Sequence, residues 1–232
     1  MPDTPSTVLV AGGTGALGGA VLAELLGAGH AVTATWVVPD ERERIESDLG
    51  GEQRLSLVEA DLLDADAVGA AVEGVSGLGA VVNLVGGFAM GKRVGEAPIE
   101  DFEAMLRLNL RPGYLLAHHA LPRLVEAGGG AFVGVSARAA LEPFSGAAGY
   151  IAAKAAVLAF VKALDAEYRD DGVRANAILP SVIDTPRNRA DMPKADHSKW
   201  VAPAAIARVV RFLVSPEAEP VSGAGVPVYG HA

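Results

Sequence analysis

The sequence predicts one doubly wound α/β domain, in which a parallel sheet of about seven strands is covered by helices on both faces. Short apolar runs rich in β-branched residues alternate with helical patterns along the chain. The first of these runs leads directly into a glycine-rich turn and then into a helix. The chain has 232 residues, of which 50% are hydrophobic, and shows no linker or internal repeat. We therefore expect residues 1–232 to form a single domain with a substantial core.

Composition and charge exclude several classes of function. The formal net charge of −9 argues against a nucleic-acid-binding surface. No apolar run is long enough to cross a bilayer, and no secretory signal is visible near Met1. The chain lacks cysteine, and its five histidines show no metal-ligand spacing; His118 and His119 lie inside a helical pattern. We expect a cytoplasmic protein with no metal site, no membrane and no nucleic-acid partner.

The elements follow from the periodicity of apolar residues. The expected strands are residues 7–11, 31–36, 55–59, 80–85, 131–135, 173–179 and 225–229. The expected helices are residues 20–26, 40–49, 64–73, a long kinked stretch over 98–110 and 113–126, a helix from about 150 to 172, and 202–214. Residues 181–200 are polar and lack periodicity, so we expect a functional loop over the substrate there.

The glycine-rich turn carries the strongest local signal. Residues 12–19 follow the first strand at once, with the spacing Gly13-x-Gly15-x-x-Gly18 of the dinucleotide fingerprint. Glycines permit a tight turn and let a pyrophosphate approach backbone N–H groups at a helix N-terminus. The alternative is a glycine-rich hairpin. In its strand–turn–helix context the motif predicts a Rossmann-type domain.

The end of the second strand leaves the choice of cofactor open. A dinucleotide fold often places an acidic residue there to hold ribose hydroxyls, or a basic residue for a 2′-phosphate. Trp36 occupies this position, and Arg42 and Arg44 follow in a charged helix. The two arginines either bind a 2′-phosphate or form a solvated helix face. NAD and NADP therefore both remain candidates.

Polar residues follow the next two strands, where ligands collect in open α/β sheets. Asp61 stands at the carboxyl end of the third strand, and Asp64 is suited to cap the following helix. Gly86 and Gly87 end the fourth strand and permit close approach to the backbone. Asn109, a poor helix former, lies inside the long helical stretch. Its side chain either has a polar role or is satisfied by neighbouring backbone.

Tyr150 and Lys154 form a candidate chemical pair. They are four residues apart, so a helix places them on one face, one turn apart. A nearby ammonium favours phenolate, so we expect Lys154 to lower the Tyr150 pKa from about 10. Tyr150 would then act as an acid or base. The alternative is an ordinary tyrosine beside a lysine whose stem extends along a hydrophobic helix.

Together these motifs resemble the short-chain dehydrogenase/reductase family over essentially the whole chain. Residues 12–18 are similar to the family's cofactor turn, with Ala16 where a glycine is usual, and residues 83–87 to its Asn-Asn-Ala-Gly segment. Asn109, Tyr150 and Lys154 match three members of its catalytic tetrad. The resemblance implies that an NAD(P)H cofactor is held by Gly12, Gly13, Thr14, Gly15, Ala16, Leu17, Gly18, Trp36, Asp61, Leu62, Asn83, Val85, Gly86, Tyr150, Lys154, Pro180, Ile183 and Thr185.

The tetrad serine is missing. The family usually places it thirteen residues before the tyrosine, where this chain has Ala137. Ser136 lies one residue earlier and either serves after a shift or leaves the site without a serine. The loop from Asp184 to Trp200 resembles that of the quinonoid dihydropteridine reductases, which also lack this serine. Trp36 and Asn109 depart from that subgroup.

The resemblance implies hydride transfer from NAD(P)H to a pterin-like or carbonyl substrate, with Tyr150 as the proton donor. Lys154 would bind the nicotinamide ribose, Asn109 would hold a water for proton relay, and Ser136 would polarise a carbonyl oxygen. The alternatives are a 3-oxoacyl or general ketone reductase, and a catalytically silent cofactor-binding regulator. Family members usually assemble through long helices, so a homodimer or homotetramer is expected. Arg138, Arg187 and Arg189 flank the expected cleft and either meet an anionic substrate or are surface charges.

Overall fold

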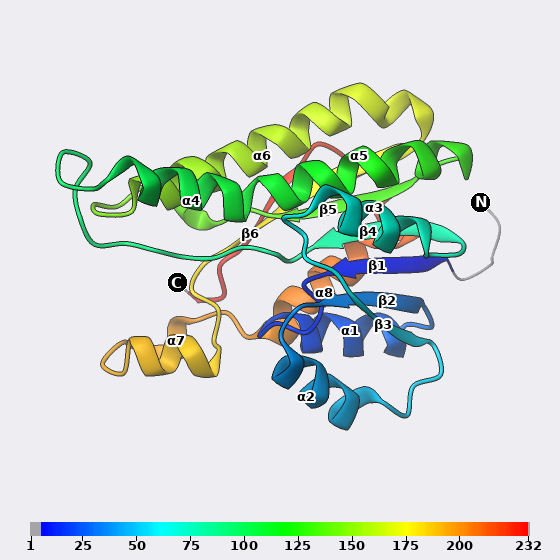
Figure 1. The fold of residues 1–232 in the computed structure, drawn as a ribbon, viewed down its shortest axis with the longest axis horizontal. Coiled ribbons are helices and arrows are strands. Elements are labelled where there is room, and N and C mark those ends of the chain that lie inside the picture. Colours follow the sequence, from blue (N-terminus) through cyan, green and yellow to red (C-terminus); the bar gives the residue numbers. More distant parts are fainter. Residues whose placement is uncertain (1–5, 232) are drawn as a thin grey trace.

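The computed structural model describes residues 6–231 and contains one parallel seven-stranded sheet with the order β3-β2-β1-β4-β5-β6-β7 (Figure 1). The strands are β1 (Thr7–Ala11), β2 (Ala31–Trp36), β3 (Leu55–Glu59), β4 (Leu78–Asn83), β5 (Gly130–Val135), β6 (Val173–Pro180) and β7 (Gly225–Val228). All of them pair in parallel, which confirms the predicted doubly wound sheet. Residues 1–5, which begin the stretch in which a secretory signal was looked for, lie outside the described part.

Helices cover both faces of this sheet. They are α1 (Gly18–Gly27), α2 (Pro39–Leu49), α3 (Ala65–Glu73), α4 (Ile99–Asn109), α5 (Arg111–Glu126), α6 (Ala148–Tyr168), α7 (Pro186–Asp191) and α8 (Pro203–Val214). Helices α3, α5 and α6 pack on one face, and α1, α2 and α8 on the other. Among the described residues, no helix is long and apolar enough to span a membrane.

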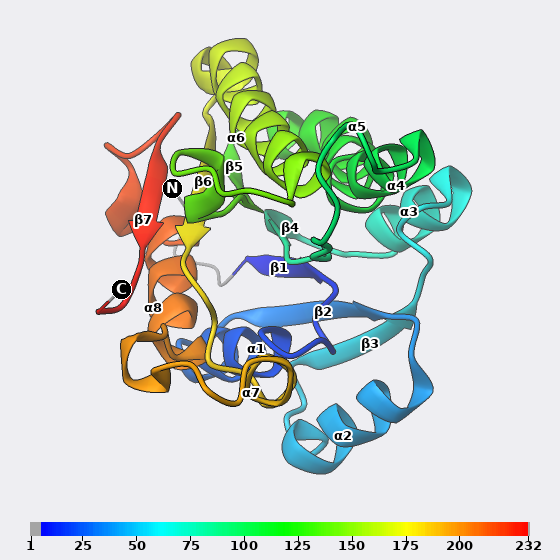
Figure 2. The ribbon, with the colours of Figure 1, turned by 90° about the vertical axis from the view of Figure 1, so that its left-hand side faces the viewer.

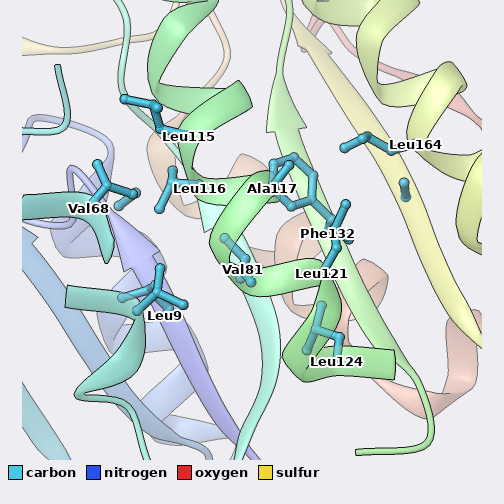
Figure 3. Packing of buried hydrophobic residues seen from close by; sticks show 14 of the residues in the cluster. Leu9, Val68, Val81, Leu115, Leu116, Ala117, Leu121, Leu124, Phe132 and Leu164 are labelled. Atoms are coloured by element: carbon cyan, nitrogen blue, oxygen red, sulfur yellow. The ribbon is translucent and has the colours of Figure 1, made fainter. Parts of the chain in front are cut away.

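The core consists of two apolar layers, because successive strand residues point to opposite faces. Leu9 and Val81 belong to the layer under α5, whereas Val8 and Val82 belong to the layer over α1 and α8. Figure 3 shows the first layer, with the fully buried Phe132 among leucines of α5. Burying this apolar surface stabilises the sheet by roughly 25 cal/mol for each Å² removed from water.

The strand order reverses at β1, which lies between β2 and β4. In such folds the crevice beyond the carboxyl ends of the strands at this switch point binds the ligand. The glycine turn after β1 and the segment after β4 both lie there (Figure 2). The fold therefore places the glycine motif at a ligand-binding edge.

Several predicted boundaries differ from the structure, and two of them bear on the site. The fourth strand was expected over 80–85, but β4 ends at Asn83, because the Asn83 side chain accepts a hydrogen bond from the N–H of Val85 at 3.1 Å. This local turn replaces the strand ladder. The expected loop over 181–200 contains α7, since Thr185 caps it by accepting from the N–H of Asn188 and Pro186 stands in its first turn.

Arg174 on β6 caps the C-terminal end of α8 with hydrogen bonds. Its guanidinium donates to the carbonyls of Leu213 at 2.9 Å, Ala218 at 3.1 Å and Ser215 at 3.1 Å. We expect Arg174→Met to lower the free energy of unfolding by about 2–3 kcal/mol, because these carbonyls lose charged donors. Urea denaturation measures the change. Arg208→Met, on the exposed side of the same helix, should cost less than about 0.5 kcal/mol; equal losses would contradict the role of Arg174.

Candidate active site

The glycine turn has no room for side chains on its inner side. A Cβ at Gly18 would lie 2.0 Å from the carbonyl oxygen of Gly13, and one at Gly13 would lie 2.7 Å from the Ala34 Cβ. Gly12 has φ +70°, and its N–H donates to the Thr35 hydroxyl at 3.0 Å. On the outer side, a Cβ at Gly15 would meet only the carbonyl oxygen of Gly12, at 3.4 Å. The turn thus presents bare backbone at the start of α1, which fits the pyrophosphate of a dinucleotide.

Helix α2 holds this turn from outside. Arg44 donates to the carbonyl of Thr14, and the Thr14 hydroxyl donates to Glu41 at 3.3 Å. Arg42 stacks over the Trp36 ring at 5.1 Å and pairs with Glu46. Both arginines already have partners within the protein. Their binding of a 2′-phosphate stays a prediction.

The acidic residues after β3 form local turns. Asp64 accepts a hydrogen bond from the N–H of Ala67 at 2.9 Å, which confirms it as the cap of α3. Asp61 accepts from the N–H of Leu63 at 2.9 Å and is exposed. The neighbouring Leu62 is buried. Asp61 is therefore accessible to a ligand at this edge of the sheet.

Tyr150 and Lys154 both lie on α6, as their spacing predicts. The Lys154 ammonium lies 5.9 Å from the Tyr150 ring centre and donates to the carbonyl of Val135 at 2.9 Å. Lys154 is 5% exposed, and burial lowers its pKa to about 8. It is therefore mostly protonated at neutral pH.

The expected lowering of the Tyr150 pKa is wrong for this structure. Burial raises the pKa of Tyr150 to about 12, because the phenolate would lose its hydration. The Lys154 ammonium is directed to the Val135 carbonyl instead of compensating this loss. Tyr150 is accordingly a protonated phenol at neutral pH, which is the state that a proton donor needs.

Asn109 connects two parts of the site. Its amide accepts from the N–H of Gly87 and donates to the Gly87 carbonyl, both at 3.1 Å, and donates to Met105 at 3.0 Å. A Cβ at Gly86 would lie 2.7 Å from the Asn109 Oδ1 and 2.9 Å from the Lys154 Nζ. The Asn109 side chain thus fixes the segment after β4 beside Lys154. Its amide is satisfied by backbone, and its role in a proton relay stays a prediction.

Ser136, the candidate for the missing serine, is buried. Its hydroxyl donates to the carbonyl of Lys154 at 2.7 Å, and the residue is 1% exposed. The hydroxyl proton that would polarise a substrate oxygen is therefore donated within the protein, which weighs against a catalytic role for Ser136, and that role stays a prediction. Position 137 is a buried alanine.

The segment after β6 brings Pro180, Ile183 and Thr185 toward the same edge of the sheet. The Thr185 N–H donates to the Ile183 carbonyl at 2.9 Å, and the Asn188 amide donates to that carbonyl at 2.8 Å. Pro180 ends β6 opposite Val228. These contacts order the segment that the sequence assigns to the nicotinamide carboxamide, a role that stays a prediction.

The sequence did not single out two aromatic residues near Tyr150, Phe88 and Phe144. The Phe88 ring lies 4.9 Å from the Tyr150 ring at 86°, and the Phe144 ring lies 6.5 Å from Phe88. The available signal was a large apolar residue directly after the Gly86-Gly87 pair, at the ligand-binding end of a strand. Phe88 is more than fifty residues from Phe144 and Tyr150 in the sequence, so its contacts with them could not be predicted from spacing.

The buried Lys154 makes stability depend on pH. Its folded-state pKa of about 8 lies below the ordinary 10.5, so between these values the unfolded chain binds the additional proton. Stability therefore rises with pH in this window. From about pH 8 to pH 10, wild type should gain about 2–3 kcal/mol relative to Lys154→Met. Urea unfolding of both proteins measures this; a constant difference would show that burial does not lower this pKa.

A Rossmann-type sheet, a bare glycine turn and a Tyr–Lys pair at the switch point define a dinucleotide-dependent oxidoreductase. A family model for short chain dehydrogenase matches residues 6–196. The chain therefore belongs to the short-chain dehydrogenase family and is an NAD(P)-dependent oxidoreductase.

Known proteins agree with this assignment. The 2,5-dichloro-2,5-cyclohexadiene-1,4-diol dehydrogenase LinX of Sphingobium indicum is 31% identical over 239 residues, covering 96% of this chain and 94% of that protein. A short-chain type dehydrogenase/reductase from Mycobacterium ulcerans matches with TM-score 0.92 and 26% identity, covering 100% and 90% of the two chains. A 3-oxoacyl acyl-carrier protein reductase with bound NAD from Brucella melitensis matches with TM-score 0.86 and 26% identity, covering 99% and 91%.

Proposed function

We propose that residues 1–232 form one dinucleotide-binding domain that reduces a pterin-like or carbonyl substrate, with Tyr150 as the proton donor. Bound NAD(P)H supplies the hydride that forms a bond at the electron-poor carbon or nitrogen of the substrate, and is oxidised in the process. The electron pair of the reduced double bond moves to the substrate oxygen or nitrogen. Tyr150 gives its phenolic proton to that atom. The glycine turn holds the pyrophosphate, and Thr185 and Ile183 hold the carboxamide.

The observation that carries this proposal is the placement of Tyr150 beside the buried Lys154 on α6. A phenol with a pKa of about 12 holds its proton until a stronger base develops on the substrate. Tyr150 and Lys154 lie on one face of α6, with the Lys154 ammonium 5.9 Å from the centre of the Tyr150 ring. Lys154 is also placed to hold the cofactor ribose, since a Cβ at Gly86 would touch its ammonium.

The missing serine favours a substrate that is already electron-poor. Ala137 offers no donor to polarise a carbonyl, and the Ser136 proton goes to the Lys154 carbonyl. A quinonoid pterin needs less polarisation than a simple ketone, in line with the loop resemblance to dihydropteridine reductases. The same observation weighs against a 3-oxoacyl reductase, whose case rested partly on Ser136. A silent regulator is disfavoured by the intact Tyr150 and Lys154.

Initial rates of NADH and NADPH oxidation with quinonoid dihydropterin, against a 3-oxoacyl thioester, test this proposal. We expect rapid turnover with the pterin, and the faster cofactor identifies the preference that Trp36 leaves open. Turnover of the thioester alone would mean that the loop resemblance reflects common ancestry and not a shared activity. Tight cofactor binding without turnover of either compound would favour the regulator.

We also propose that the chain forms a homodimer or homotetramer through α4, α5 and α6. A groove of about 670 Å³ lies on their outer surface, and its lining includes Leu106, Leu110, Tyr114 and Phe160. Tyr114 is 56% exposed there. Light scattering should give a mass of two or four chains; a single-chain mass at micromolar concentration would contradict this. Cytoplasmic location stays a prediction.

A further inference from the structure

Phe88 and Phe144 form an aromatic wall beside Tyr150, the proposed proton donor. The Phe88 ring meets the Tyr150 ring edge-on, with centres 4.9 Å apart, and the Phe144 ring lies 6.5 Å from Phe88 at 46°. Phe88 is 57% exposed and Phe144 is 45% exposed. Large apolar rings seldom stay exposed side by side without a ligand or partner to cover them. Phe88 packs directly against the ring of the proposed proton donor.

The wall is held in place by backbone contacts. Phe88 lies in the segment that follows β4, and Phe144 in the segment that precedes α6. The Gly91 N–H donates to the Gly146 carbonyl at 2.8 Å, which ties the two segments together. Gly146 has φ +83°, and a Cβ there would lie 3.0 Å from the Gly91 carbonyl oxygen. Near the other end, Asn109 fixes Gly87 next to Phe88. The rings are therefore positioned before a substrate arrives.

The three arginines that the sequence places around the expected cleft are all paired with carboxylates. Arg138 pairs with Glu142 at 2.9 Å, Arg187 with Asp191 at 2.7 Å, and Arg189 with Asp184 at 2.5 Å. Each of these arginines is thus neutralised by a carboxylate from its own segment.

We propose that Phe88 and Phe144, together with Tyr150, bind a planar uncharged ring that carries or adjoins the reacting group of the substrate. Aromatic rings pack with centres about 4.5–7 Å apart, which is the spacing within this wall. A substrate ring that covers Phe88 lies next to the Tyr150 phenol, so ring binding and proton transfer use one surface. This inference rests on the proposed reductase function and specifies its substrate class.

The test compares two neutral ketones with equal numbers of carbons, the fused-ring β-tetralone and the open-chain methyl octyl ketone. Wild type should have the higher kcat/KM for β-tetralone. Phe88→Leu keeps apolar bulk but removes the ring, and should lower kcat/KM for β-tetralone about fivefold to tenfold. The same variant should change the value for methyl octyl ketone by less than about twofold, because a flexible chain gains no ring stacking. Phe88→Tyr should retain the preference.

Two controls separate the ring wall from general damage. Val94→Ala changes an exposed side chain (74%) of the same segment and should leave both kcat/KM values unchanged. Cofactor affinity, measured by NADPH fluorescence, should be the same in Phe88→Leu and wild type. The proposal that the wall binds a ring would be overturned if Phe88→Leu lowered kcat/KM equally for both ketones, or if wild type showed no preference for β-tetralone. Neither result would contradict the reductase function.

A binding measurement covers the case in which wild type reduces neither ketone. Calorimetry with the protein–NADP complex should show tighter binding of β-tetralone than of methyl octyl ketone, and Phe88→Leu should abolish the difference. Equal affinities would overturn the ring-binding wall. Failure of the reductase function is read separately, as absence of turnover with every substrate including quinonoid dihydropterin.

Discussion

Replacing Tyr150 with phenylalanine is expected to lower kcat about 10²–10⁴-fold, the usual contribution of a positioned general acid. The variant keeps the ring, and with it the edge-on contact to Phe88 at 4.9 Å, so the site should stay folded. It removes only the hydroxyl whose proton neutralises the reduced substrate. Steady-state rates with saturating cofactor measure kcat. A fluorescence titration should give cofactor affinity within about twofold of wild type, since the glycine turn is untouched.

Tyr168→Phe is the matched control, because Tyr168 ends the same helix and should tolerate loss of its hydroxyl without change in kcat. The pH dependence adds a second readout. A Tyr150 pKa of about 12 keeps the donor protonated at neutral pH, so a fall in rate near pH 8 would report Lys154 instead. Near-wild-type turnover by Tyr150→Phe would place the proton donor elsewhere.

The sequence predicts elements whose cause is local. The parallel sheet follows from apolar runs such as residues 7–11 and 173–179, which alternate with helical patterns and meet their partners in the structure. The Tyr150–Lys154 spacing fixes their shared helix face because helix geometry is regular. Asp64 was predictable as a cap for the same reason, since its partner is three residues away.

Contacts between residues that are far apart in the chain could not be predicted from the sequence. The Ser136 hydroxyl donates to a carbonyl eighteen positions later, so its availability depends on how α6 packs against β5. The Tyr150 pKa depends on burial and on the direction of the Lys154 ammonium, and neither follows from spacing. Phe88 and Phe144 meet only because Gly91 and Gly146 join their segments. These features decide the chemistry of the site, whereas the local ones decide its location.

Replacing Gly18 with alanine is expected to weaken cofactor binding roughly tenfold to a hundredfold, because overpacking costs about 1–3 kcal/mol. The new Cβ would lie 2.0 Å from the carbonyl oxygen of Gly13 and 2.4 Å from its carbonyl carbon. Both are backbone atoms, so no side chain can rotate away, and the turn itself must open. Fluorescence titration with NADH and NADPH measures the loss.

Gly27→Ala provides the opposite result within the same helix. Gly27 is the last residue of α1, and a Cβ there would meet nothing within 4 Å. Alanine is the better helix former by roughly 0.5–1 kcal/mol, so this variant should bind cofactor normally and unfold at an equal or higher urea concentration. If Gly18→Ala also binds normally with unchanged stability, the contact between residues 13 and 18 does not shape the cofactor turn. If both variants lose affinity equally, α1 as a whole, and not the turn at its start, determines cofactor binding.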